Sequence, residues 1–218
     1  MNKTILITGA SDGLGFATAG KLLAKGYRVI GLSRSKPRDD RIDYIELDLT
    51  DENSIKNAVQ QILTLPDEID ILVNCAGVMA REDDLSREEL DRVFWSNALG
   101  VILLESLLLP KIKEIGADVI NVISTTALRG DTRQPIYGAS KWALRGFTKS
   151  LQEQFKGANA RAVNFVSGGF VSRMPEKIGK TIDDPENWLP VDIVADELVK
   201  VIETPKRAEI SEIIVNRK

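Results

Sequence analysis

The sequence predicts an α/β fold, a doubly wound parallel sheet of about seven strands with helices on both faces. Short apolar, β-branched runs alternate with segments of helical periodicity along the whole chain, which is typical of strands joined by helical crossovers. The first run, Thr4 to Thr8, leads directly into a glycine-rich turn and then into a helical pattern. Ligands of such sheets bind at the carboxyl ends of the strands, so we expect the functional residues there.

The remaining elements follow from composition and spacing. Runs rich in valine, isoleucine and leucine predict strands at residues 4–8, 27–32, 44–47, 69–73, 119–123, 161–166 and 210–215. Apolar residues at helical spacing predict helices at residues 16–25, 54–63, 86–109, 136–155 and 191–202. Thr50 or Asp51 can cap the second helix, and Ser86 with Glu89 fits a capping box at the start of the third. No repeat or linker interrupts the pattern, so we expect residues 1–218 to form a single domain.

The composition excludes several classes of function. The 218 residues are 43% hydrophobic and have a net charge of −3, and the isoelectric point of about 5.3 argues against nucleic acid as the main partner. The longest apolar run, Val101 to Leu109, is too short for a membrane span and is followed by Lys111 and Lys113. No secretory segment is recognisable near the start. We therefore expect a cytoplasmic protein without a membrane partner.

The chain contains no histidine, and Cys75 is its single cysteine. A Ser-His-Asp triad, a histidine base and an intrachain disulfide are thereby ruled out within this chain. Only a carboxylate-type metal site would be possible, and no clustered spacing suggests one, so we predict no metal.

The run Gly9 to Gly15, between the first strand and the first helix, has the glycine spacing GxxxGxG. Because glycine has no Cβ, such a turn lets backbone N–H groups and the helix N-terminus approach a pyrophosphate. The run therefore predicts a dinucleotide site. The predicted contacts within it are Gly9, Ser11, Asp12, Gly13, Leu14 and Gly15.

The end of the second strand favours NADP(H) over NAD(H). In NAD binders an acidic residue about 20 positions after the glycine turn holds the ribose hydroxyls, but here Ser33 and Arg34 occupy that place. No carboxylate would repel a 2′-phosphate, and the planar fork of an arginine suits phosphate. Lys36 and Arg38 add positive charge, which two following aspartates reduce.

Tyr137 and Lys141 lie four residues apart in a predicted helix, so both side chains belong to one helix face. A phenol is a weak acid with an unperturbed pKa of about 10, and a nearby ammonium favours the phenolate and lowers that pKa. The pair therefore suits proton transfer to or from a reacting group.

These features together resemble the short-chain dehydrogenase/reductase family, in its compact single-domain branch with a Rossmann-type sheet. The matching motifs appear in the family's order from residue 8 to about residue 170. They are the TGxxxGxG turn at 8–15, an NNAG-like stretch at 74–77 with Cys75 in second place, Asn97, Ser124 thirteen residues before Tyr137, and YxASK at 137–141.

The resemblance implies a role for each of these residues. Tyr137 would exchange a proton with the substrate oxygen, and Lys141 would lower the phenol's pKa and hydrogen-bond the nicotinamide ribose. Ser124 would orient the substrate oxygen, Asn97 would support a proton-relaying water, and Asp48 would contact the adenine. The further coenzyme contacts that it implies are Leu49, Asn74, Ala76, Gly77, Tyr137, Lys141, Gly169 and Val171.

Two positions depart from the family pattern. Gly168 replaces the proline that usually follows the sixth strand, and Arg173 stands where the family has a threonine that holds the nicotinamide amide, with Ser172 as a possible substitute. The segment from Arg173 to Pro190 corresponds to the family's substrate lid. Its apolar members, and the other candidates for the pocket wall, are Met174, Ile178, Trp188, Met79, Leu128 and Gln134.

A short lid with few polar anchors suggests a small or medium carbonyl or alcohol substrate. The resemblance implies a homodimer or homotetramer paired through the helices at 94–109 and 136–155. Two other functions compete with this one. An epimerase or dehydratase of nucleotide sugars would need a larger C-terminal substrate part. A catalytically weak, redox-sensing NAD(P)-binding module would usually lack part of the Ser-Tyr-Lys set, which is complete here.

Overall fold

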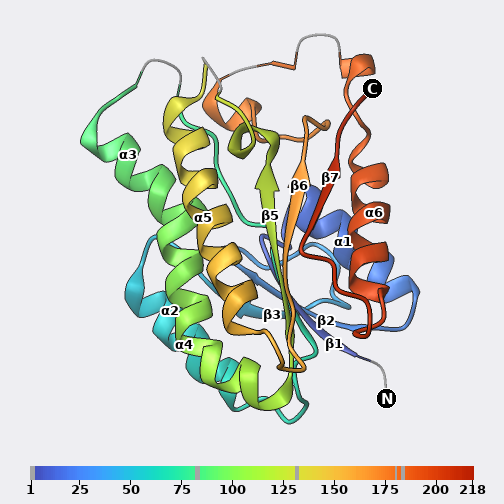
Figure 1. Ribbon diagram of the computed structural model, residues 1–218. Helices are drawn as coiled ribbons and strands as arrows, with labels where there is room; N and C mark the ends of the chain where they lie inside the picture. The colour runs from blue at the N-terminus through green and yellow to red at the C-terminus, as the bar shows by residue number, and fades with distance from the viewer. Residues whose placement is uncertain (1–2, 82–83, 131–132, 180, 183–184) are drawn as a thin grey trace.

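The computed structural model describes residues 3–81, 84–130, 133–179, 181–182 and 185–218. Seven parallel strands form one sheet in the order β3-β2-β1-β4-β5-β6-β7 (Figure 1). The strands are β1 (Thr4–Thr8), β2 (Arg28–Ser33), β3 (Asp43–Glu46), β4 (Ile71–Asn74), β5 (Asp118–Ser124), β6 (Ala162–Ser167) and β7 (Glu212–Val215). The predicted doubly wound parallel sheet is confirmed.

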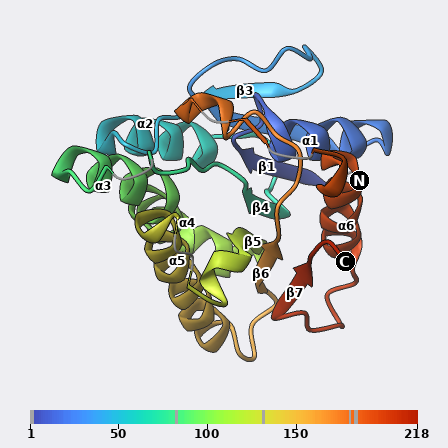
Figure 2. The ribbon, with the colours of Figure 1, turned by 90° about the horizontal axis from the view of Figure 1, so that it is seen from above.

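Helices cover both faces of the sheet, as predicted. The α-helices are α1 (Gly13–Ala24), α2 (Glu52–Leu63), α3 (Arg87–Phe94), α4 (Gly100–Ile115), α5 (Pro135–Gln154) and α6 (Val191–Glu203). Figure 2 shows α1 and α6 on one side of the sheet and α2, α4 and α5 on the other. Each side has its own apolar core, and the buried strand residues contribute alternately to the two cores.

The strand order reverses between β1 and β4, because the chain runs outward from β1 to β3 and then crosses back to β4. A doubly wound sheet leaves a crevice at such a reversal, beyond the carboxyl ends of the strands. Several strands end one residue later than the sequence predicts, at Ser33, Asn74, Ser124 and Ser167. The three serines therefore line the crevice, whereas Asn74 is buried.

The predicted caps are largely confirmed. Asp51, rather than Thr50, caps α2 and accepts a hydrogen bond from the Asn53 N–H at 2.8 Å. Ser86 caps α3 by accepting from the Glu89 N–H at 3.2 Å. The second half of the capping box is absent, because the buried Glu89 carboxylate accepts from Arg92 instead, at 2.6 and 2.8 Å.

The third helix is longer than the sequence predicts. α3, the π-helical turn η1 (Trp95–Leu99) and α4 form a continuous helix of 29 residues, Arg87–Ile115. It continues through Pro110 and ends at Gly116, whose φ of 70° is left-handed and favours glycine. By length and composition it is the one helix of the described residues that could cross a membrane. Core helices pass the same test, and here Leu104 and Leu108 are buried against the sheet and α2.

A buried polar cluster lies between the sheet and this helix. Asn74 of β4 donates from Nδ2 to Glu105 Oε1 at 2.8 Å and to Asn121 Oδ1 at 2.9 Å. Asn121 in turn donates to Thr148 of α5 at 2.9 Å. Burial raises the pKa of Glu105 to about 8, against the opposing hydrogen bonds from Asn121 and Asn74. The carboxyl is therefore protonated near neutral pH.

Protonation also suits the polar atoms around Glu105. Within the described part of the chain, Glu105 Oε2 and Asn74 Oδ1 find no hydrogen-bond partner. A neutral carboxyl supplies one donor, whereas a carboxylate supplies only acceptors. The hydrogen bonds of the cluster thus require a protonated Glu105, whereas a solvent-exposed glutamate would be ionised at neutral pH.

We expect Glu105→Gln to make the protein less sensitive to alkali. The folded-state pKa lies above that of the unfolded chain, so the wild type loses stability as the pH rises from the unfolded value toward about 8. Glutamine keeps a donor and an acceptor without a charge, so the variant should be more stable near pH 8 by on the order of 2 kcal/mol. Urea unfolding near pH 5.5 and near pH 8.5 measures the difference, with exposed Glu114→Gln as control. Equal loss of stability in wild type and variant would contradict a proton on Glu105.

Candidate active site

A cleft of about 650 Å³ opens beyond the carboxyl ends of β1, β2, β4, β5 and β6. It runs from the turn after β2, past the glycine-rich turn, to the N-terminal part of α5 and the segment after β6. Most of the predicted site residues line it. They are Gly9, Ser11, Asp12, Gly13, Leu14, Gly15, Ser33, Arg34, Asp48, Leu49, Ala76, Gly77, Ser124, Tyr137, Lys141 and Gly169.

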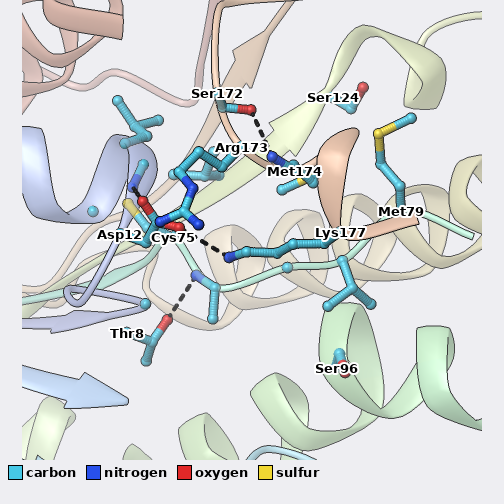
Figure 3. Close-up of a pocket in the computed structure, with 18 of the residues that line it drawn as sticks. Thr8, Asp12, Cys75, Met79, Ser96, Ser124, Ser172, Arg173, Met174 and Lys177 are labelled. Carbon is cyan, nitrogen blue, oxygen red and sulfur yellow. Dashed lines mark hydrogen bonds and ion pairs between the residues drawn. The ribbon is translucent and has the colours of Figure 1, made fainter. Parts of the chain in front are cut away.

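The glycine-rich turn is shaped by two close backbone approaches. A Cβ on Gly15 would lie 2.5 Å from the Gly9 carbonyl oxygen, and one on Gly9 would lie 2.9 Å from Ala76 Cα. Gly9 and Gly13 also have φ values of 72° and 56°, in the left-handed region that favours glycine. Thr8 Oγ1 accepts from the Ala76 N–H at 3.1 Å and ties β1 to the turn after β4 (Figure 3). The turn therefore presents backbone without Cβ atoms at Gly9, Gly13 and Gly15, next to the N-terminus of α1.

The end of the cleft beyond β2 is basic. Arg34 and Arg38 line it, and the Arg38 guanidinium lies 4.3 Å from the centre of the Phe16 ring. The two nearby acidic residues are bound by other cations. Asp40 pairs with Lys36 at 2.7 Å and Asp39 with Arg41 at 2.6 Å. The carboxylates are therefore neutralised within the loop, while two guanidinium groups face the cleft.

Lys141 is buried at the centre of the cleft, with 4% of its surface exposed. Its Nζ donates to the Val122 carbonyl of β5 at 3.0 Å and lies 6.0 Å from the centre of the Tyr137 ring. Burial lowers the pKa of Lys141 to about 8, while the charge interaction with Cys75 opposes this. Burial likewise raises the pKa of the Cys75 thiol to about 12, so this cysteine is a neutral wall residue.

Ser124 stands at the end of β5 and faces the cleft (Figure 3). Its Oγ accepts from the Thr126 N–H at 3.2 Å and so caps a short 3₁₀ turn, η2 (Thr125–Ala127). An accepting hydroxyl still has its own proton to donate. The capping role expected for a strand-end hydroxyl and a role toward a ligand are therefore compatible.

Asn97 lies in the π-helical turn η1 and is fully buried. Its Nδ2 donates to the Val78 carbonyl at 2.9 Å and to Ser140 Oγ at 3.0 Å, and its Oδ1 accepts from the Val78 N–H at 2.7 Å. A Cβ on Gly77 would lie 3.2 Å from Asn97 Oδ1 and 3.4 Å from Lys141 Nζ. Asn97 thus lies on the same side of Gly77 as Lys141 and does not itself line the cleft, and a side chain on Gly77 would contact both groups tightly.

Two further predicted contacts lie away from the cleft surface. Asn74 is buried beneath the cleft floor, where it belongs to the polar cluster with Glu105. Val171 lines an adjoining hollow, which shares Asp12, Gly13, Ser172 and Arg173 with the cleft. Among the described residues that could form the substrate wall, Met79, Gln134, Met174 and Trp188 line the cleft, whereas Leu128 and Ile178 do not.

The cleft also contains residues that the sequence did not single out. The most informative is Lys177, from the short turn η3 (Glu176–Ile178), whose Nζ lies 3.0 Å from Asp12 Oδ2. A basic residue in this segment is visible in the sequence, but its partner far back in the chain is not. Among the described residues, no group of three His, Cys, Asp or Glu side chains is placed to hold a metal ion.

Comparison with known proteins decides the family. The family model of the short chain dehydrogenases matches residues 3–183, most of the chain. The chain belongs to the short-chain dehydrogenase/reductase family. It is 33% identical over 199 residues to a 3-oxoacyl-(acyl-carrier-protein) reductase, FabG, of Thermotoga maritima, covering 82% of this chain and 80% of that protein. It is 37% identical over 182 residues to the FabG protein of Buchnera aphidicola, covering 78% of this chain and 73% of that protein.

The solved structures agree on the fold. An alcohol dehydrogenase from Thermococcus sibiricus, complexed with 5-hydroxy-NADP, superposes with a TM-score of 0.85 at 24% identity. The alignment covers 99% of this chain and 96% of that one. Likeness at this identity shows the Rossmann-type architecture shared by the short-chain dehydrogenases.

One of the two departures from the short-chain dehydrogenase pattern lies at a close contact. A Cβ on Gly168 would meet the end of the exposed Asn216 side chain, which follows β7 and would have to turn away to admit a larger residue. The next residue is similarly restricted, since a Cβ on Gly169 would lie 2.5 Å from Trp188 Cζ3. The chain end and the lid therefore pack directly on the backbone after β6.

We expect Lys141→Met to stabilise the protein while removing activity. Because the folded-state pKa is depressed to about 8, the buried ammonium destabilises the fold below that pH, and the effect is relieved as the pH rises toward the unfolded value. Methionine fills similar space without charge, so stability near pH 7 should rise by on the order of 2 kcal/mol. Urea unfolding measures this change, with exposed Lys200→Met as control. A variant less stable than wild type would show that the ammonium stabilises the folded state.

Proposed function

We propose that this chain is an NADP(H)-dependent oxidoreductase that transfers hydride between the nicotinamide and a small or medium carbonyl or alcohol substrate. The observation that supports this most is that Ser124, Tyr137 and Lys141 line the same cleft as the glycine-rich turn. The FabG relatives are named 3-oxoacyl-(acyl-carrier-protein) reductases, and a 3-oxo group is a carbonyl. Gly9, Gly13 and Gly15 form a cradle that fits a dinucleotide, because Gly9 and Gly13 adopt left-handed backbone and a Cβ on Gly9 or Gly15 would meet neighbouring backbone.

The protein's own groups account for the proton chemistry. A bound nicotinamide would supply or accept the hydride. Tyr137 would give its hydroxyl proton to the carbonyl oxygen in reduction and take one in oxidation. Lys141, while protonated, would favour the phenolate by its charge, and the Ser124 hydroxyl would donate to the substrate oxygen. Asn97 would hold the backbone at Val78 and, through Gly77, fix the wall beside Lys141.

The preference for NADP(H) follows from the charges beyond β2. Arg34 and Arg38 line the cleft, and the neighbouring aspartates are paired with Lys36 and Arg41. A 2′-phosphate there would meet two guanidinium groups and no unpaired carboxylate of that loop. Arginine binds phosphate through parallel N–H donors, and its charge does not depend on pH in the physiological range.

The apolar side chains in the wall of the cleft support the proposed substrate class. They are Met79, Phe170, Met174 and Trp188. Gln134 also lines the cleft, but its amide is bound to the Ala80 backbone at 3.0 and 3.1 Å. An apolar wall with few available polar groups suits a small or medium aldehyde, ketone or alcohol.

We further propose that the chain works as a homodimer or homotetramer in the cytoplasm, with residues 1–218 as one domain. Leu99, Leu107 and Trp142 are exposed on the helices that the family pairs between subunits. Exposed apolar side chains on neighbouring helices are typical of an interface.

The assignment of Tyr137 can be tested by Tyr137→Phe. Removing the hydroxyl leaves the ring in place but takes away the proton donor, so turnover should fall about 1,000-fold. NADPH oxidation with a panel of aldehydes and ketones measures it, and an unchanged NADPH dissociation constant would show that the cleft is intact. Turnover that survives the substitution would refute the proposed role. Wild-type protein that binds NADPH but turns over no carbonyl compound would favour the redox-sensing module instead.

The coenzyme preference can be tested by Arg34→Ala. Loss of the guanidinium should weaken NADPH binding by about 10- to 100-fold and leave NADH binding nearly unchanged, because NADH has no 2′-phosphate. Fluorescence titration with both coenzymes measures this. Arg87→Ala is the matched control, since Arg87 is an exposed arginine of α3 that pairs with Asp91 and does not line the cleft. Tighter binding of NADH than NADPH by the wild type would overturn the preference.

A further inference from the structure

The lid reaches across the cleft and contacts the glycine-rich turn through one ion pair. Lys177 Nζ of η3 lies 3.0 Å from Asp12 Oδ2, and Figure 3 shows its side chain extending to the carboxylate with Arg173 alongside. All three residues line the cleft. Two cationic side chains of the lid, Lys177 and Arg173, therefore lie near the N-terminus of α1.

Asp12 occupies a position that favours an anion. Its Oδ1 accepts from the Gly13 N–H at 2.8 Å and caps α1, where the unpaired backbone donors and the helix dipole attract negative charge. Burial alone would raise its pKa, but hydrogen bonds from Lys177 and Gly13 and the charges of Lys177 and Arg173 lower it. Asp12 is therefore ionised, and a pyrophosphate at the same helix end would add further negative charge.

The ion pair itself does little for the fold. The side chains of Lys177 and Asp12 are 59% and 36% exposed, and exposed ion pairs contribute almost nothing to stability. Arg173 is also largely exposed, with Nε 3.5 Å from Glu176 Oε2, and it lines both the cleft and the adjoining hollow. A structural role thus explains poorly why two lid cations gather at this point.

We propose that Lys177, positioned by Asp12, and Arg173 bind the pyrophosphate of the coenzyme from the lid side. The inference rests on the proposed function, because it assumes that a dinucleotide occupies the cleft. An ammonium has three donors, so Lys177 can hold Asp12 and a phosphate oxygen together and screen their repulsion. Arg173 stands where other family members have a threonine, so the lid holds the coenzyme by charge instead of by a hydroxyl.

Lys177→Met tests the proposal. It should weaken NADPH binding about 10-fold and flatten the dependence of the dissociation constant on salt, because one cation to phosphate is lost. Binding of adenosine 2′-monophosphate, which has the 2′-phosphate but no pyrophosphate, should stay unchanged in competition titrations. Lys177→Arg should restore NADPH affinity to within about 3-fold of the wild type. Arg173→Thr is the second variant and should lose NADPH affinity in the same selective way.

The matched control is Lys200→Met, because Lys200 is an exposed lysine of α6 in a similar ion pair, with Glu197 at 2.6 Å. Thermal unfolding confirms that each variant is folded. Equal loss of NADPH and adenosine 2′-monophosphate binding would overturn the inference, as would NADPH affinity in Lys177→Met equal to that of the Lys200→Met control. Those results would leave the proposed function standing. Wild-type protein that binds neither NADPH nor NADH would refute the proposed function and this inference together.

Discussion

The buried ammonium group of Lys141 is the interaction on which the rest of the site depends. It sits where α5 crosses the end of β5, and the Val122 carbonyl accepts from it at 3.0 Å. A charge in such a place is destabilising unless it is solvated by the protein, which the depressed pKa of Lys141 records. In the proposed function this charge has a use, because an ammonium beside the Tyr137 phenol favours the phenolate and so assists proton exchange nearer to neutral pH.

Backbone groups form part of the environment of Lys141. Gly77 lies beside its ammonium without a Cβ, and Asn97, in a π-helical turn, is hydrogen-bonded to the backbone N–H and carbonyl of the next residue, Val78. Single π-helical turns within α-helices occur frequently at functional sites, since they redirect one side chain without ending the helix. Here the turn lets a 29-residue helix serve both as core element and as support for the cleft.

The sequence was sufficient for the fold and for most of the cleft lining. The spacing of apolar residues and the alternation of strand and helix segments predicted about seven parallel strands. The ordered motifs placed Ser124, Tyr137 and Lys141 near the glycine turn. The features that it missed depend on how deeply a side chain is buried and on contacts between residues distant in the chain. Asn74 follows a strand like other cleft residues, yet it turns into the core to meet Glu105, and no local pattern shows how deep a side chain lies. The pairing of Lys177 with Asp12 likewise follows only from tertiary structure.

The departures from the family pattern form one connected change. Asn216, after β7, takes the space next to Gly168, and Trp188 of the lid packs against Gly169. The backbone after β6 is therefore confined by the chain end on one side and by the lid on the other. The lid that follows has Arg173 in place of a threonine and brings Lys177 to the helix end at Asp12. A hydroxyl acts only over hydrogen-bond distance, whereas a charge acts over several ångström. In the proposed function, a lid attached by packing at one end can thus bind the anionic part of the coenzyme by charge, while the contact of the family's threonine with the nicotinamide amide is lost.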